Sequence, residues 1–233
     1  MNEFDIFPTE YFNQSGLNRQ HVFNLAELPA AVQQKLAPQP GERQLILFGH
    51  AGRRLWEAVQ ASGIGGEDPI DDYSIQTMTT WFAQHAPDRH FRILFPGNQP
   101  IALQALGQLA GWHHAAPFMV GIDAEWGSWF AYRAVVISDT NFQPNLAVDR
   151  INPCLSCSAK PCISACPASA MDDGNFALGP CLDYRQQADS SCANTCLARL
   201  ACPIGQEHRY TAEQMHHSYS RSLKLIRDFK TRR

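Results

Sequence analysis

The eight cysteines of this chain constrain its fold more than any other feature, because all of them lie between Cys154 and Cys202. The first four are spaced as C-x2-C-x4-C-x3-C-P, and this run ends at Pro167. The remaining cysteines are Cys181, Cys192, Cys196 and Cys202. A [4Fe–4S] cluster is held by four cysteine thiolates, so eight cysteines are the number that two clusters need. The pattern predicts two [4Fe–4S] clusters in an electron carrier or a redox enzyme.

The spacing allows two divisions of these ligands. In the bacterial run C-x2-C-x2-C-x3-C-P, the fourth cysteine binds the other cluster of a two-cluster ferredoxin. Three cysteines in a tight loop can surround one face of a cluster, while the fourth lies on the turn that leads away. A crossed division then groups Cys154, Cys157, Cys162 and Cys202 against Cys166, Cys181, Cys192 and Cys196. An uncrossed division, with the first four cysteines on one cluster, uses the same eight ligands and stays open.

Three other uses of cysteine compete with the clusters. Structural zinc sites usually show two C-x2-C pairs separated by a longer spacer, and this chain lacks that arrangement. Disulfides need an oxidising compartment, but the first residues, MNEFDIFP, have neither the basic nor the apolar region of a signal peptide. Unligated cysteines would be far more numerous here than ordinary usage provides. Reduced, metal-binding thiols and a cytoplasmic location are therefore expected.

Composition excludes two classes of partner. The chain has 233 residues, of which 45% are hydrophobic, enough for a core outside the cysteine region. Its apolar stretches are well short of the ~20 residues that a membrane span needs, so no membrane partner is expected. The formal net charge is −3, and basic residues gather only at 230–233. We therefore expect no nucleic-acid partner.

Outside the cysteines, short strands and amphipathic helices alternate. Apolar runs predict strands at 44–49, 91–95, 118–122 and 129–137. Helical spacing and capping residues predict helices at 53–61, from Asp68-Pro69, from Pro100 to about Gly111, and from the capping box Thr211–Gln214 to about 232. No G-x-G-x-x-G fingerprint stands at a strand-to-helix turn, so a Rossmann domain is not indicated. The expected class is α+β, with a mixed or antiparallel sheet and flanking helices.

Several segments resemble known families. Residues 127–137, GSWFAYRAVVI, are similar to the G-G-W-F-A-I-R-G-V-V strand of the cblC-type cobalamin-processing proteins. Agreement extends to DIFP at 5–8, DPID at 68–71 and RYTAEQ at 209–214. The same strand followed by a two-cluster module also resembles epoxyqueuosine reductases and reductive dehalogenases, which pair a nitroreductase-like cobalamin domain with two [4Fe–4S] clusters. The resemblance implies a nitroreductase-like body with an inserted bacterial dicluster ferredoxin-like module.

This resemblance implies three regions and a direction of electron flow. They are a cobalamin-binding-like body at 1–145, a cluster module at 146–207, and a C-terminal helix at 208–233 that returns to the body. The clusters would take electrons from a flavodoxin, a ferredoxin or a flavin reductase and deliver them to bound cobalamin, in a chain that forms a homodimer as cblC-type relatives do. The alternatives are a ferredoxin-like protein that has no cobalamin and docks a separate enzyme, and a zinc-bound interaction module.

Five residues are candidates for the cofactor site. Trp129 and Phe130 belong to an aromatic strand that suits a flat macrocycle, although strand aromatics often form core. Arg133 needs an acidic partner, which either the protein or a ligand can supply. His113 and His114 follow a helix end, where they would act as axial ligands, as proton donors or simply as caps.

Two departures from these families limit the transfer of chemistry. Glu125 stands where cblC-type proteins have an arginine, which argues against a glutathione-dependent reaction. The catalytic aspartate of epoxyqueuosine reductase has no counterpart between Leu94 and Gln99. No catalytic residue is therefore assigned, and reduced clusters would supply the electrons that a thiol supplies elsewhere.

Overall fold

The computed structural model describes residues 4–146, 148–172 and 175–231, and the chain divides into two compact units. The first unit comprises 1–111 and 130–148. The second comprises 112–129 and 149–233, which includes every cysteine. The short segment 112–129 thus belongs with the cysteine region, although a strand of the first unit separates the two in sequence.

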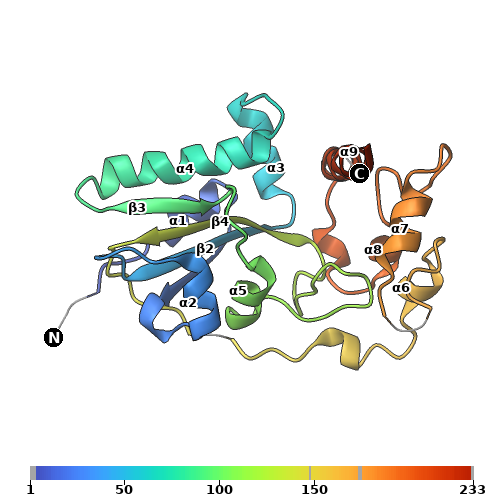
Figure 1. Ribbon diagram of the computed structural model, residues 1–233, viewed down its shortest axis with the longest axis horizontal. Helices are drawn as coiled ribbons and strands as arrows, with labels where there is room; N and C mark the ends of the chain where they lie inside the picture. Colours follow the sequence, from blue (N-terminus) through green and yellow to red (C-terminus); the bar gives the residue numbers. More distant parts are fainter. Residues whose placement is uncertain (1–3, 147, 173–174, 232–233) are drawn as a thin grey trace. The chain divides into compact units, whose positions relative to one another are not determined.

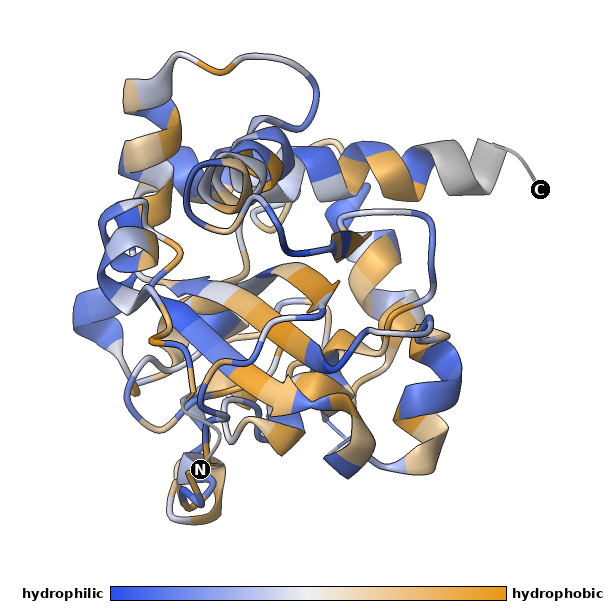
Figure 2. Cartoon of the chain, turned by 90° about the vertical axis from the view of Figure 1, so that its left-hand side faces the viewer, coloured by the Kyte–Doolittle hydropathy of each residue, from blue (hydrophilic) through white to orange (hydrophobic). Residues whose placement is uncertain are grey.

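The first unit is built on a four-stranded antiparallel sheet in the order β1-β2-β4-β3. The strands are β1 (Arg19–Asn24), β2 (Gln44–Ala51), β3 (Phe91–Phe95) and β4 (Phe130–Ser138). Every residue of β2 is buried, as expected for an inner strand covered on both faces. Figure 2 shows the hydrophobic residues concentrated along these strands. The α+β class is confirmed, and the sheet is antiparallel rather than mixed.

Helices cover both faces of this sheet. Figure 1 shows α3 (Arg54–Ser62) and α4 (Pro69–His85) on one face, with α2 (Ala30–Leu36) and α5 (Leu103–Leu109) on the other. The short helix α1 (Thr9–Gln14) contributes Phe12 to the main core, where it packs against Phe48 and Trp81. The predicted start of α4 is confirmed, with Asp68 at the N-cap position and Pro69 as the first helical residue.

The strand expected at 118–122 does not form, and that prediction is wrong. The described residues of this segment show only an isolated antiparallel bridge between His114 and Ile122. Pro117 cannot donate a ladder hydrogen bond. Gly121 lies against the imidazole of His113, since an added Cβ there would stand 2.2 Å from His113 Nδ1. The segment is therefore a packed loop, although its apolar run resembles a buried strand.

The second unit consists of short helices joined by turns. They are α6 (Pro161–Ser164), α7 (Leu178–Arg185), α8 (Leu197–Ala201) and the longer α9 (Ala212–Thr231). The expected cap of α9 is confirmed, because the backbone N–H of Gln214 donates to Thr211 Oγ1 at 3.1 Å. No helix in the described ranges is both long and apolar enough to cross a membrane.

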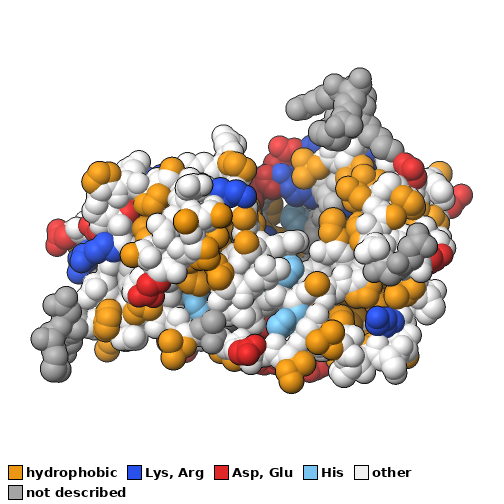
Figure 3. Space-filling view, turned by 60° about the horizontal axis from the view of Figure 1, so that its bottom comes forward, with side chains coloured by type: hydrophobic (Ala, Val, Ile, Leu, Met, Phe, Trp, Pro, Cys, Tyr) orange, Lys and Arg blue, Asp and Glu red, His pale blue; other side chains and the backbone are white. Residues whose placement is uncertain are grey.

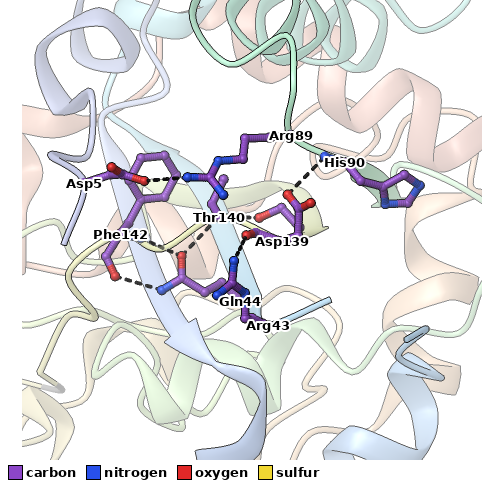
Figure 4. Close-up of polar contacts among 9 residues, drawn as sticks. Asp5, Arg43, Gln44, Arg89, His90, Asp139, Thr140 and Phe142 are labelled. Atoms are coloured by element: carbon purple, nitrogen blue, oxygen red, sulfur yellow. Dashed lines mark hydrogen bonds and ion pairs between the residues drawn. The ribbon is translucent and has the colours of Figure 1, made fainter. Parts of the chain in front are cut away.

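A buried amide ties the segment after β4 to the sheet. Gln44 accepts from the Phe142 N–H at 2.8 Å and from Thr140 Oγ1 at 3.0 Å, and its Nε2 donates to the Phe142 carbonyl at 2.8 Å. Figure 4 shows this network beside the pairs of Asp139 with Arg43 and His90. One side chain thus satisfies three buried polar groups, which fixes the path of the chain as it leaves the sheet.

We expect Gln44→Leu to lower the free energy of unfolding by about 3 kcal/mol. Leucine is similar in size, so the loss comes from polar groups of Phe142 and Thr140 that stay buried without partners. Gln60→Leu, at an exposed position of α3, is the matched control and should change stability by less than ~0.5 kcal/mol. Urea unfolding of both variants measures the difference. Equal stabilities would contradict this role for Gln44.

Candidate metal centres

One cavity of the second unit is lined by four cysteines, of which three are close together in sequence and the fourth lies much further along the chain. They are Cys154, Cys157, Cys162 and Cys202. Cys154 and Cys157 precede α6 and Cys162 lies within it, in a segment shaped by two local interactions. Asn152 Oδ1 accepts from the Cys154 N–H at 2.9 Å, and Lys160 adopts a left-handed conformation (φ 38°) just before Pro161 opens α6. The chain returns through Cys202, at the end of α8, to complete the set.

The four thiols of this first cavity form an electrostatically coupled group. Burial, followed by the charges of Cys202, Cys162 and Cys157, raises the pKa of Cys154 to about 11. Burial, followed by the charge of Cys157, likewise raises the pKa of Cys202. Buried thiols with raised pKa values, such as those of Cys154 and Cys202, resist ionisation unless a cation neutralises them. The cavity is therefore suited to a positively charged metal centre. Binding of the metal would release protons from these thiols.

A second cavity is lined by the other four cysteines, Cys166, Cys181, Cys192 and Cys196. Cys166 follows α6, Cys181 lies within α7, and the last two lie in the loop before α8. Burial raises the pKa of Cys181, and the charges of Cys196, Cys166 and Cys192 raise it further. Burial, followed by the charge of a neighbouring cysteine, also raises the pKa of Cys196. These four thiols therefore form a second coupled group.

The grouping of the cysteines is that of the crossed division. Cys166 lines the second cavity although Cys162 lines the first, and Cys202 closes the first cavity from the far end of the region. Within the described residues, no three His, Cys, Asp or Glu side chains are placed to hold one metal ion. In a four-iron cluster each thiolate binds a separate iron, so the sulfur atoms surround a cavity rather than a point. The two cavities fit that chemistry.

The histidine pair lies in the second unit beside the loop that was expected to be a strand. Burial, and to a smaller extent the charge of His114, lowers the pKa of His113, whose side chain is buried against Gly121. The backbone of His114 pairs with Ile122 in both directions, at 2.9 and 3.0 Å. Both histidines are thus held in place, and His113 is biased toward its neutral form.

Trp129 is fully buried within the second unit. The Arg199 guanidinium lies 4.3 Å from the centroid of its ring, and Tyr210 meets the ring edge-on at 5.4 Å. The residue therefore packs as core in this conformation. Glu125, also in this unit, pairs with Arg150 at 3.1 Å, so its charge is matched within the protein.

Phe130 and Arg133 lie on β4, in the first unit. The Arg19 guanidinium lies 5.4 Å from the centroid of the Phe130 ring. Arg133 lies 3.9 Å from Asp71 and 3.3 Å from His50 Nε2. A carboxylate of the protein thus stands near Arg133. The five candidates for a cofactor site are divided between the units, with His113, His114 and Trp129 in the second.

Comparison with known proteins identifies the fold. No protein-family model matches the chain, and no curated protein matches it. Epoxyqueuosine reductase in complex with a tRNA-Tyr stem loop has a TM-score of 0.55 and 13% identity over 89% of this chain and 67% of that chain. The Bacillus subtilis epoxyqueuosine reductase has a TM-score of 0.55 and 13% identity over 87% of this chain and 65% of that chain. The chain therefore has an epoxyqueuosine reductase-like fold and spans about two thirds of those enzymes.

A further solved structure is the B12-trafficking protein CblC of C. elegans. Its TM-score is 0.45, with 13% identity over 88% of each chain, and no conclusion follows from a likeness this weak. At 13% identity the comparisons define the fold, and the tRNA in the complex belongs to that enzyme.

Proposed function

We propose that this chain is an iron–sulfur redox protein whose second unit is a dicluster ferredoxin-like module. The observation that carries the proposal is the sorting of all eight cysteines into two cavities of four. One cluster would be held by Cys154, Cys157, Cys162 and Cys202, and the other by Cys166, Cys181, Cys192 and Cys196. Bound clusters supply one-electron storage at potentials that can be strongly negative.

Apolar residues form much of the lining of the first cavity. Phe118 and Ile122 are buried there, and Pro117, Pro153 and Pro203 complete an apolar lining. An apolar lining disfavours the added negative charge of a reduced cluster and so favours a low potential. The loop at 117–122 therefore does more than connect elements, since it covers the ligands contributed by the cysteine run.

Metal analysis of anaerobically purified protein tests the proposal. We expect about eight iron and about eight acid-labile sulfide per chain, with a broad visible absorbance that bleaches on addition of dithionite. Zinc in place of iron, with no labile sulfide, would support the interaction-module alternative and contradict the redox role.

We propose further that the electrons are delivered to cobalamin bound by the first unit, with Phe130 and Arg133 of β4 as the candidate cofactor contacts in that unit. The epoxyqueuosine reductase-like fold and the resemblance of residues 127–137 to cobalamin-processing proteins support this assignment. The alternative, a ferredoxin-like protein that docks a separate enzyme, uses the same clusters without a corrin.

An anaerobic titration with hydroxocobalamin separates these two functions. We expect a saturable shift of the corrin spectrum with oxidised holoprotein, and stoichiometric reduction of cobalt once the clusters have been reduced by dithionite and the excess removed. Arg133→Gln should weaken the binding that this spectral shift measures about tenfold, because the substitution removes a cation from β4. Arg43→Gln, on the Asp139 side of the same unit, is the matched control. Cobalt reduction without any saturable binding would favour the ferredoxin-like alternative.

We retain as a proposal that the chain binds no nucleic acid. On the face shown in Figure 3, the Lys and Arg side chains lie apart from one another rather than in a patch. A tRNA-Tyr stem loop is the probe that the comparisons suggest. Micromolar binding in fluorescence anisotropy, at physiological salt and with the steep salt dependence of phosphate contacts, would contradict the proposal.

A further inference from the structure

Two arginines that no sequence motif marked as functional are buried in the second unit. Arg185 lies at the end of α7 with 8% of its surface exposed, and Arg199 lies in α8 with 7% exposed. Each follows a cysteine at helical spacing, since Cys181 precedes Arg185 by four positions and Cys196 precedes Arg199 by three. That spacing places Arg185 on the same side of α7 as Cys181, and it places Arg199 in the first turn of α8, after Cys196 at the N-cap position.

Arg185 is held by neutral groups from two segments. Its guanidinium donates to the carbonyls of Cys192 and Ala193 at 3.3 and 3.4 Å, in the loop that carries two of the cysteines. It also donates to the Tyr219 carbonyl at 3.0 Å and to Ser222 Oγ at 3.2 Å, both on α9. The Tyr219 ring lies 5.2 Å away. Arg185 thus joins α9 to the cysteine loop through partners that, among the described residues, are all neutral.

Arg199 has a similar environment on the other side of the cysteine loop. Its Nε donates to Ser128 Oγ at 3.1 Å, and its Nη2 donates to the Ser128 carbonyl. The rings of Trp129 and Tyr210 lie 4.3 and 4.8 Å from the guanidinium carbon. All of these partners are neutral, so among the described residues it is dipoles and aromatic faces that solvate the charge of Arg199.

Within the described part of the chain, every contact of these two guanidiniums is with a neutral group. Burying a charge without a counter-charge is costly, so a site with two buried cations calls for an anion. Both arginines line the cavity of Cys166, Cys181, Cys192 and Cys196. The anion that fits is a cluster with four thiolates, of charge about −2 when oxidised.

The first cavity has a different charge environment. Its cations are Lys160, which is exposed, and Arg209, which is only partly buried. Solvent and salt screen an exposed lysine far more strongly than a buried guanidinium. The two cavities therefore hold chemically similar ligand sets in unequal electrostatic fields, and the second field favours additional negative charge.

We propose that Arg185 and Arg199 are the counter-charges of the second cluster and give it a higher reduction potential than the first. The inference rests on the proposed two-cluster function. One electron supplied by a reductant such as dithionite passes from the first cluster, whose charge returns from −3 to −2, to the second, whose charge changes from −2 to −3. No bond breaks and no proton moves in this step. Electrons entering the chain therefore collect on the cluster bound by Cys166, Cys181, Cys192 and Cys196.

The test is a dithionite redox titration of the holoprotein, followed by electron paramagnetic resonance. Wild type should show two transitions. Arg185→Gln and Arg199→Gln should each lower the equilibrium constant for reduction of the higher-potential transition about tenfold, which is ~59 mV for one electron, and leave the lower transition in place. Arg185→Lys and Arg199→Lys keep the positive charge but lose the planar guanidinium. In these variants the reduction potential should return most of the way to the wild-type value. Lys160→Gln is the control and should change neither transition more than about twofold.

The outcomes separate this inference from the proposed function. A preparation without iron and labile sulfide overturns both. Two clusters whose potentials respond equally to glutamine and lysine would show that the arginines act through packing alone, and this overturns the inference only. The same holds if the lower transition moves instead of the higher one. A variant in which Cys154 and Cys202 are both replaced by alanine shows which transition belongs to which cluster. It should retain only the higher-potential transition.

Discussion

Replacing Cys154 and Cys202 together by alanine is expected to remove about half of the iron and labile sulfide, whereas replacing Cys154 and Cys166 removes nearly all of it. Both double variants lose two of the eight cysteines, so each is the control for the other. In the crossed division, Cys154 and Cys202 belong to one cluster and a single cluster is lost. Cys166 belongs to the other cavity, so its loss together with Cys154 disables both clusters.

The uncrossed division predicts the reverse. In that division Cys154 and Cys166 share a cluster, and Cys202 belongs to the other one. Iron and sulfide analysis of the two anaerobically purified variants, with spin quantitation after reduction, therefore decides between the divisions. If the Cys154 and Cys202 variant lost nearly all of its iron while the other variant kept half, the grouping of thiols in the cavities would not reflect cluster ligation.

Removal of the metal is expected to unfold much of the second unit and leave the first intact. The second unit has a small apolar core of Phe118, Ile122, Met171 and Ala198, completed by Cys162 and Cys202. Its helices α6 and α8 span four and five residues, too short to persist without tertiary support. The first unit has a large aromatic core around Phe12, Phe48 and Phe82. Cluster binding would therefore supply most of the folding free energy of the second unit.

Hydrogen exchange measured before and after anaerobic chelation checks this expectation. Peptides from 154–202 should lose protection by at least about a hundredfold, since metal binding and folding are coupled in small metal domains. Peptides from β2 and β4 are the internal control and should keep their protection. Equal protection of the second unit with and without iron would show that it folds on its own, and would weaken the link between the cysteines and a metal.

The parts of the fold that follow from local sequence were predictable. The strands at Gln44–Ala51 and Phe91–Phe95 are apolar runs bounded by turn residues, and the helix from Pro69 has a proline at its first position. The strand Arg19–Asn24 was not predicted, because only His21 and Val22 are buried and its polar residues pair with β2 at the edge of the sheet. An edge strand depends on its neighbour more than on its own pattern.

The candidate site, like the fold, has parts that could be predicted from local sequence and parts that could not. The number and spacing of the cysteines are sufficient to predict two four-thiol centres, because ligand chemistry is carried by residue type. The burial of Arg185 and Arg199 was not anticipated, although their spacing from Cys181 and Cys196 is visible in the sequence. Burial of an arginine depends on groups distant in sequence, here Ser128 for Arg199 and Tyr219 for Arg185. Spacing alone therefore could not distinguish them from surface arginines.

An anaerobic crystal structure with an anomalous difference map at the iron edge tests the central claim most directly. The account predicts two compact iron peaks per chain, one within reach of the sulfur atoms of Cys154, Cys157, Cys162 and Cys202, and the other within reach of those of Cys166, Cys181, Cys192 and Cys196. Single-atom peaks at the zinc edge, or disulfide bonds among these cysteines in place of iron, would contradict it.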